Sequence, residues 1–221
     1  KKMKRLENRN PAVPGFKAAG LDCGIKDDNI KDLALIVSEV PATAAAVFTK
    51  NRVVSPGVTW SRRALAKSGS CRAVIVNSGN ANAVTGAKGL KDCDAITKKV
   101  AAELGIPQKE VFIASTGIIG VPLPSEKILK ATPKLISKLG KAAKSWTDAS
   151  EAIMTTDLIS KSDRVSYSFK GKRIVIGGIT KGSGMIHPNM ATMLGFTFTN
   201  AVIDSKTLKK ALTEAADRSF N

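Results

Sequence analysis

The chain has 221 residues, of which 43% are hydrophobic and 24% charged, and this balance is typical of a globular protein and excludes a disordered one. No apolar run approaches the roughly 18 residues of a membrane-spanning helix, and the three cysteines are widely spaced without a CxxC pair. These observations argue against a membrane protein, a disulfide framework and a zinc site, and we expect a cytoplasmic protein with reduced thiols.

The net charge of +17, from 35 Lys and Arg against 18 Asp and Glu, raises the question of an acidic partner. The basic residues are scattered through the whole chain, aromatic residues are only 5%, and no aromatic RNA-binding motif is present. We therefore expect a solvated lysine surface, or one that faces an acidic chain, and no nucleic acid or membrane as partner. The basic segment 1–13 is expected to be a flexible end.

The first half of the chain predicts alternating strands and helices. Apolar runs predict strands at 32–40, 44–54 and 71–79, and a short helix at 61–69 should end at Gly69. Between residues 90 and 104 the apolar positions recur at steps of three and four, which predicts the clearest helix of the sequence.

The second half continues the same alternation. Strands are expected at 110–117 and 195–203, a hairpin at 165–179 around "KGK", and a helix at 205–220. Ser125 can cap a helix over 126–140 that Pro133 must kink or divide. The sum is an α/β chain.

Several strand ends are rich in glycine, asparagine and hydroxyl side chains: "NSGNANAVTG", "ASTGIIG", "MTTD" and "KGSGMIHPNMAT". Glycine lets the backbone approach a ligand closely, and backbone amides there can stabilise a negative oxygen. Each loop taken singly is also an ordinary turn.

Common catalytic schemes fit the sequence poorly. His187 is the only histidine, so a site of several metal-binding histidines is excluded, and its place before Pro188 favours a structural role. No Walker A motif or dinucleotide fingerprint occurs.

Hydroxyl chemistry without histidine remains. A threonine becomes a nucleophile when it is the first residue of a chain, because its own α-amino group, with a pKa of about 8, accepts the hydroxyl proton. Thr192 is internal, so this mechanism requires cleavage between Ala191 and Thr192. A buried threonine that enters a strand is the alternative on residue chemistry alone.

The stretch "KGSGMIHPNMATML" resembles the processing site of the ornithine acetyltransferases, the bifunctional glutamate N-acetyltransferase/ornithine acetyltransferase enzymes of arginine biosynthesis. The segments "AVIVNSGNANAVTG", "FIASTGIIGVPLP" and "AIMTTD" also resemble that family's N-terminal half, in the same order. The resemblance runs from about Pro14 to the end of the chain. It implies a layered α/β sandwich with β-sheets between helices, of the N-terminal-nucleophile-like type.

The resemblance also implies a self-cleaving acyltransferase. Cleavage between Ala191 and Thr192 would divide an α-chain domain, 14–191, from the start of a β chain, 192–221, whose remainder this sequence does not contain. Thr192 would then carry the acetyl group from N-acetylornithine to glutamate. An N-terminal-threonine amidohydrolase or aminopeptidase is the alternative.

The family's site residues carry over onto matching positions. Thr116 and Gly117 would form the oxyanion hole, and Lys181 and Thr155, or its neighbour Thr156, would contact the substrate. No metal and no cofactor are implied, and the resemblance leaves open whether acetyl-CoA also serves as acetyl donor. The expected partner is the β chain, in an α2β2 heterotetramer.

Overall fold

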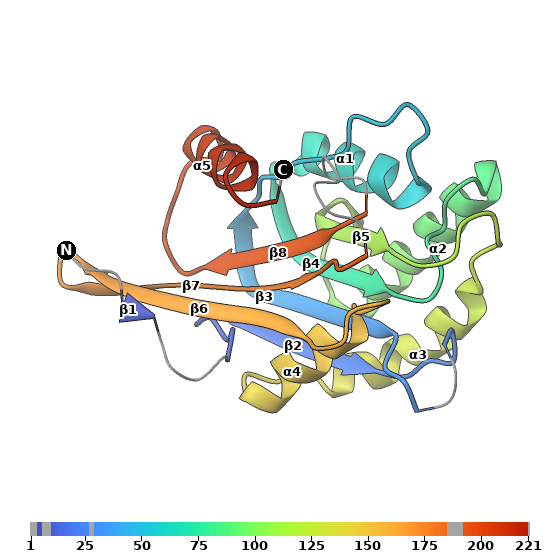
Figure 1. The fold of residues 1–221 in the computed structure, drawn as a ribbon, viewed down its shortest axis with the longest axis horizontal. Helices are drawn as coiled ribbons and strands as arrows, with labels where there is room; N and C mark the ends of the chain where they lie inside the picture. The colour runs from blue at the N-terminus through green and yellow to red at the C-terminus, as the bar shows by residue number, and fades with distance from the viewer. Residues whose placement is uncertain (1–3, 6–9, 27–28, 185–191, 221) are drawn as a thin grey trace.

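A computed structural model describes residues 4–5, 10–26, 29–184 and 192–220 of the chain (Figure 1). It contains two four-stranded sheets. The first has the order β2-β3-β4-β5, with β2 at Phe16–Leu21, β3 at Leu33–Thr43, β4 at Ser70–Asn77 and β5 at Val111–Ser115. The second has the order β1-β6-β7-β8, with β1 at Lys4–Arg5, β6 at Lys161–Phe169, β7 at Lys172–Lys181 and β8 at Leu194–Thr199.

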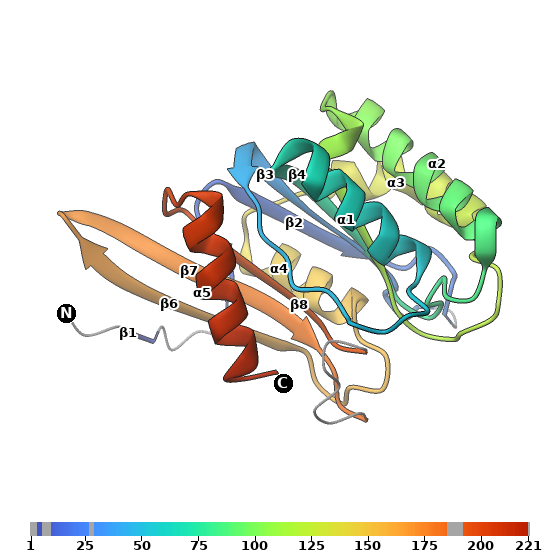
Figure 2. The same cartoon turned by 90° about the horizontal axis from the view of Figure 1, so that it is seen from above.

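The helices α1 to α4 cover different faces of the first sheet. Their bounds are α1 Pro56–Ser68, α2 Gly86–Leu104, α3 Ser125–Ser137, α4 Ala143–Ala152 and α5 Ser205–Asp217, with a short 3-10 helix η1 at Gln108–Glu110. Helices α1, α2 and α3 lie on one side of the first sheet, and α4 and the second sheet lie on the other (Figure 2). The predicted α/β class with layered sheets is confirmed.

The core forms two clusters, one on each face of the first sheet. Strand β3 serves both, because successive side chains point to opposite faces: Leu33 and Leu35 join the helical side, whereas Ala34 and Ile36 face the second sheet. On that second side Trp146 of α4 is fully buried, and its ring lies edge-on to that of Phe198 at 5.4 Å between centroids. Burial on both faces explains why β3 reads as a continuous apolar run.

Besides the short elements β1 and η1, the sequence-based prediction lacked β2 and α4. They pack against each other, and the fit depends on Gly20: a Cβ there would lie 2.1 Å from the backbone oxygen of Asp148. A segment rich in glycine, alanine and proline gives a weak strand signal, so this strand is determined by its tertiary contact.

Three predicted features were wrong. The segment 44–54, which was predicted as a strand, is an irregular connection. The strand before it, β3, extends to Thr43. The division of a helix at Pro133 is also wrong: helix α3 runs undivided through this proline, and Ile128 and Leu135 on either side of it pack into one cluster. Ser125 is not the N-cap of this helix, because Pro124 occupies that position. The hydroxyl of Ser125 donates instead to the carboxylate of Asp92 at 2.8 Å.

Other predictions are confirmed within a few residues. Gly69 ends α1 in the left-handed conformation, with φ of 64°. The hairpin of β6 and β7 turns through Lys170 and Gly171, both with positive φ, as a two-residue turn requires. The confirmation does not extend to segment 1–13, which was expected to be a flexible end: within it β1 pairs with β6 and Val13 is buried.

Candidate functional site

The candidate site begins where β4 and β5 end. These strands are parallel, so their carboxyl ends meet at one edge of the sheet, where the polar loops 77–82 and 115–120 follow. Backbone bonds join the two loops: Thr116 N–H donates to Asn77 O at 3.0 Å, and Ile118 N–H donates to Gly79 O at 3.2 Å. The two loops therefore form one connected structure.

Gly117 is required at the centre of this structure. Its φ is +137°, and a Cβ built on it would lie 2.3 Å from the carbonyl carbon of Gly79. No side chain fits between the two loops at this point. The neighbouring Thr116 is 9% exposed, so its hydroxyl lies in a largely buried position.

Lys181 reaches the same place from the second sheet. It is the last residue of β7, where alternate residues turn inward, and it follows Val175, Gly177 and Ile179 on the buried face. Its ammonium nitrogen Nζ donates to Thr116 Oγ1 at 3.2 Å and to the backbone oxygen of Thr192 at 3.5 Å. Three residues of the predicted site thus lie together, although Thr116 is 65 residues away from Lys181 in the sequence.

Burial governs the charge of Lys181. The residue is only 6% exposed, and burial lowers the pKa of its amine below the ordinary 10.5. The carboxylate of Asp157 opposes this effect on the pKa, and the ammonium of Lys161 adds to it. Asp157 is thus a neighbour that sequence reasoning did not single out, although it ends the quoted segment "MTTD".

The loop that contains Thr155 and Thr156 lies beside the end of β7. Thr156 Oγ1 and Ser183 Oγ are 2.9 Å apart, and the backbone N–H of Thr155 donates to Asp157 at 3.4 Å. Thr155 also lines a pocket of about 340 Å³, together with Lys26, Asn29, Ile30, Lys31, Glu151, Met154 and Asp157. Both threonines therefore lie near Lys181, but they have different hydrogen-bond partners: Asp157 for Thr155 and Ser183 for Thr156.

Lys26 is a half-buried amine near this site. Its ammonium donates to Met154 O at 2.6 Å and to Lys31 O at 3.2 Å. Burial lowers its pKa, Asp32 opposes that change, and the charge of Lys181 lowers the pKa further. Lysines are common throughout this sequence, so no local signal distinguishes Lys26 in advance.

Thr192 is exposed and stands two residues before β8. The alternative of a buried threonine entering a strand is therefore wrong. Ala191, the other side of the predicted cleavage bond, and His187 lie outside the described residues.

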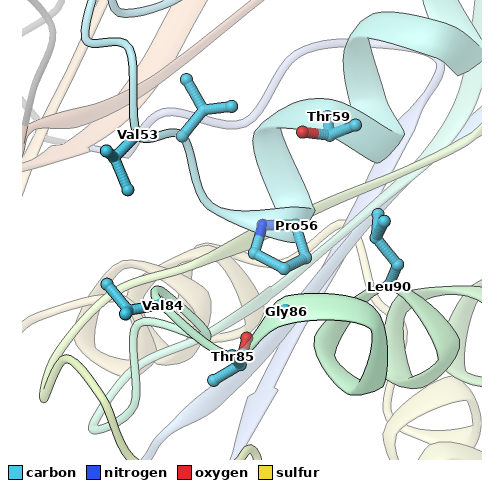
Figure 3. A pocket seen from close by; sticks show the side chains of 8 residues that line it. Val53, Pro56, Thr59, Val84, Thr85, Gly86 and Leu90 are labelled. Carbon is cyan, nitrogen blue, oxygen red and sulfur yellow. The ribbon is translucent and has the colours of Figure 1, made fainter.

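The larger pocket, of about 450 Å³, has a different character (Figure 3). Its walls are mainly aliphatic, and the lining residues are Val53, Val54, Pro56, Thr59, Val84, Thr85, Gly86 and Leu90. In the close-up (Figure 3), Val53, Pro56 and Thr59 lie across from Val84, Thr85 and Gly86. It contains no ionisable side chain and none of the predicted site residues. We do not assign it to catalysis.

Thiol and metal chemistry find no support in the part of the chain that the structure describes. Burial raises the pKa of Cys71 and of Cys93 to about 12, and burial together with Asp32 raises that of Cys23 as well. No group of three or more metal-binding side chains occurs among those residues. In the same residues no helix is long and apolar enough to span a membrane.

Comparison with known proteins gives one family. The model of the ArgJ family matches residues 17–221. The arginine biosynthesis bifunctional protein ArgJ of Caldanaerobacter subterraneus is 46% identical over 220 residues, which are 99% of this chain and 53% of that protein. The ArgJ protein of Thermosynechococcus vestitus is 44% identical over 95% of this chain and 50% of its own length. The chain thus spans about half the length of these curated relatives.

Solved structures agree with this result. A crystal structure of ArgJ from Bacillus halodurans matches with a TM-score of 0.81 and 37% identity, over 87% of this chain and 98% of that one. Ornithine acetyltransferase from Mycobacterium tuberculosis, complexed with ornithine, matches with a TM-score of 0.78 and 36% identity, over 84% and 97%. An L-aminopeptidase D-Ala-esterase/amidase from Ochrobactrum anthropi, at 9% identity and a TM-score of 0.58, shares the fold alone.

Proposed function

Because this chain belongs to the ArgJ family, we propose that the protein containing it transfers the acetyl group of N-acetylornithine to glutamate, a step of arginine biosynthesis in the cytoplasm. Thr192 is the nucleophile, and cleavage of the bond between Ala191 and Thr192 prepares it. The observation that carries the proposal is the position of the Lys181 ammonium, within 3.5 Å of both Thr116 Oγ1 and the backbone oxygen of Thr192.

Cleavage comes first. The hydroxyl of Thr192 attacks the carbonyl of Ala191, the peptide nitrogen leaves as an amine, and the acyl group moves from nitrogen to oxygen. Water then hydrolyses the ester, which restores the hydroxyl and leaves Thr192 with a free α-amino group. This amine becomes the general base for the transfer reaction.

The lengths of the matched chains support a break near Thr192. This chain covers only about half of the two curated ArgJ relatives, whereas it covers 98% and 97% of the two solved chains. The solved Bacillus halodurans chain, nearly all of which is matched by 87% of this chain, is therefore only about half as long as a curated ArgJ relative.

Transfer then proceeds through an ester. The hydroxyl of Thr192 loses its proton to the free amine and attacks the acetyl carbonyl, and ornithine leaves with a proton on its nitrogen. The hydroxyl of Thr116 and the backbone N–H of Gly117 stabilise the negative oxygen of each tetrahedral intermediate. The amine of glutamate then attacks the acetyl-threonine ester and regenerates Thr192.

The substrates are amino acids, and their recognition requires a positive partner for a carboxylate. We assign this role to Lys181, with the hydroxyl of Thr155 or Thr156 beside it. The Mycobacterium tuberculosis relative was crystallised with ornithine, a product of the proposed reaction, which supports this substrate class. No cofactor enters the proposed steps.

The remaining half of the relatives' length completes the proposal. We assign it to a β chain that begins at Thr192 and joins the α chain in an α2β2 heterotetramer. An acidic β half would also balance the +17 of the present sequence.

The test uses the full-length protein with N-acetylornithine and glutamate. Formation of N-acetylglutamate and ornithine supports the proposal, whereas free acetate without N-acetylglutamate identifies an amidohydrolase instead. Replacing N-acetylornithine by acetyl-CoA in a parallel reaction decides whether the enzyme also makes N-acetylglutamate from that donor.

A further inference from the structure

Asp157 has a position that the proposed reaction does not by itself explain. It lies in the connection between α4 and β6, and its side chain is only 1% exposed. Three donors converge on its carboxylate: the N–H of Gly182 at 2.9 Å, the N–H of Thr155 at 3.4 Å, and the ammonium of Lys161. A buried carboxylate with this many donors holds their positions relative to one another.

Two of those contacts fix the residue next to Lys181. Asp157 accepts the N–H of Gly182, and Lys161, its ion-pair partner, donates to the carbonyl of the same glycine at 2.9 Å. Both polar backbone groups of Gly182 are therefore bound by one ion pair. This determines where β7 ends and the point from which the Lys181 side chain extends toward Thr116.

The charges around Lys181 come from three further elements. Asp157 after α4 is the negative neighbour and Lys161 on β6 is a positive one. The half-buried Lys26 after β2 is a further amine, whose pKa is lowered by the charge of Lys181. Burial lowers the pKa of Lys181, Asp157 raises it and Lys161 lowers it. The ammonium of Lys181 thus depends on Asp157 for a compensating charge.

We propose that Asp157 is the positioning residue of this site, which holds Lys181 beside Thr116 through Gly182 and provides the negative charge that accompanies its ammonium. Asp157 does not touch the reacting atoms. The inference rests on the proposed function for the role of Lys181 as carboxylate partner, but the geometry and charge of Lys181 are measurable without activity.

The first test is the titration of Lys181 in the full-length protein. Lysine amines are labelled with 13C-methyl groups, and the NMR signal of Lys181 is identified by its loss in Lys181→Arg. Asp157→Asn should lower the pKa of Lys181, and Lys161→Met should raise it, because the two neighbours have opposite charge. Asp148→Asn is the matched control, since Asp148 is a paired carboxylate on α4 that bonds Lys31 and Lys144.

The outcomes separate clearly. A pKa of Lys181 that is the same in folded Asp157→Asn and in the wild type overturns the inference. If Asp157→Asn does not fold, the Lys161→Met variant provides the test. A pKa of Lys181 that does not rise in Lys161→Met also overturns the inference.

A kinetic test links the position to the reaction. In Asp157→Asn we expect the KM for glutamate to increase about tenfold with a smaller change in kcat, and the alkaline rise of KM to begin at lower pH. Unchanged KM and an unchanged pH profile contradict the inference. If the wild-type protein shows no acetyl transfer, the proposed function is refuted. The NMR titration then still tests the effect of Asp157 on Lys181.

Discussion

The ammonium of Lys181 donates to the hydroxyl of Thr116 at 3.2 Å, across 65 residues of sequence. Lys181 belongs to the second sheet, and Thr116 directly follows the last strand of the first. The contact therefore joins the two layers of the fold at the edge where their polar loops gather. Any change that moves one sheet against the other would change the candidate site.

Thr192→Ala should abolish both cleavage and transfer, because alanine has no hydroxyl to attack either carbonyl. Intact mass of the purified full-length protein measures the first effect. Thr197→Ala is the matched control, since Thr197 is an exposed threonine on β8, and it should be cleaved normally. Two fragments from Thr192→Ala would contradict the assignment.

Thr116→Ala should reduce kcat by about 100-fold or more, since one oxyanion donor contributes roughly 3 kcal/mol to the transition state. Thr116→Ser keeps the hydroxyl and should retain most of the activity. Steady-state kinetics at saturating substrate measure both variants. Equal activity of the two would show that the hydroxyl has no role.

Gly117→Ala should destabilise the protein more than Gly120→Ala. Both glycines have positive φ, so an alanine at either costs on the order of 1 kcal/mol in backbone strain. Only Gly117 has backbone 2.3 Å from the new methyl group, whereas nothing lies within 4 Å at Gly120. Urea unfolding of the two variants measures the difference, and equal losses would refute this account of the loop contact.

Trp146→Ala should lower the free energy of unfolding by about 3–5 kcal/mol, because a fully buried indole is removed from the core beside Phe198. Val202→Ala, at a fully exposed position, should change it by less than about 0.5 kcal/mol. Thermal or urea unfolding measures both. A loss at Trp146 no larger than at Val202 would mean that α4 is not part of the folded core.

Acid should weaken the contribution of Asp157. Burial alone would raise its pKa, but the bonds from Lys161, Gly182 and Thr155 lower it below the ordinary 3.8. The stabilisation is therefore complete above pH 3.8 and is lost as the pH falls through the lower native value. The stability difference between wild type and Asp157→Asn, from urea unfolding at a series of pH values, should shrink in acid. A difference that does not depend on pH would contradict this.

Local signals were sufficient for elements that carry their own pattern. Helix α2 has apolar residues at helical spacing and ends at Gly105 with φ of 63°, and the β6–β7 hairpin has its turn residues in the sequence. Helix α4 lacks such signals: its cap residue, Ala142, makes no side-chain capping bond. It forms because Trp146 and Ala149 are buried against β2, which no local pattern shows.

The candidate site divides in the same way. The glycine-rich and hydroxyl-rich loops at Thr116, Lys181 and Thr192 were visible as unusual strand ends, and the family resemblance assigned their roles. The ion pair of Asp157 and Lys161 joins the loop after α4 to β6, and its bonds to Gly182 exist because the end of β7 lies beside that loop. Its effect on Lys181 depends on burial, which a sequence does not display.

The pairing of β7 with β8 has a consequence for a chain that is cut. Lys181 pairs with Leu194, and the ladder continues through five more residue pairs to Ile176 and Thr199. Breaking one peptide bond between these strands leaves the ladder intact, so the downstream fragment stays bound and a newly formed terminus at Thr192 is retained near Lys181. Its local concentration would then be that of a tethered group, on the order of millimolar or more, whatever the dilution of the protein.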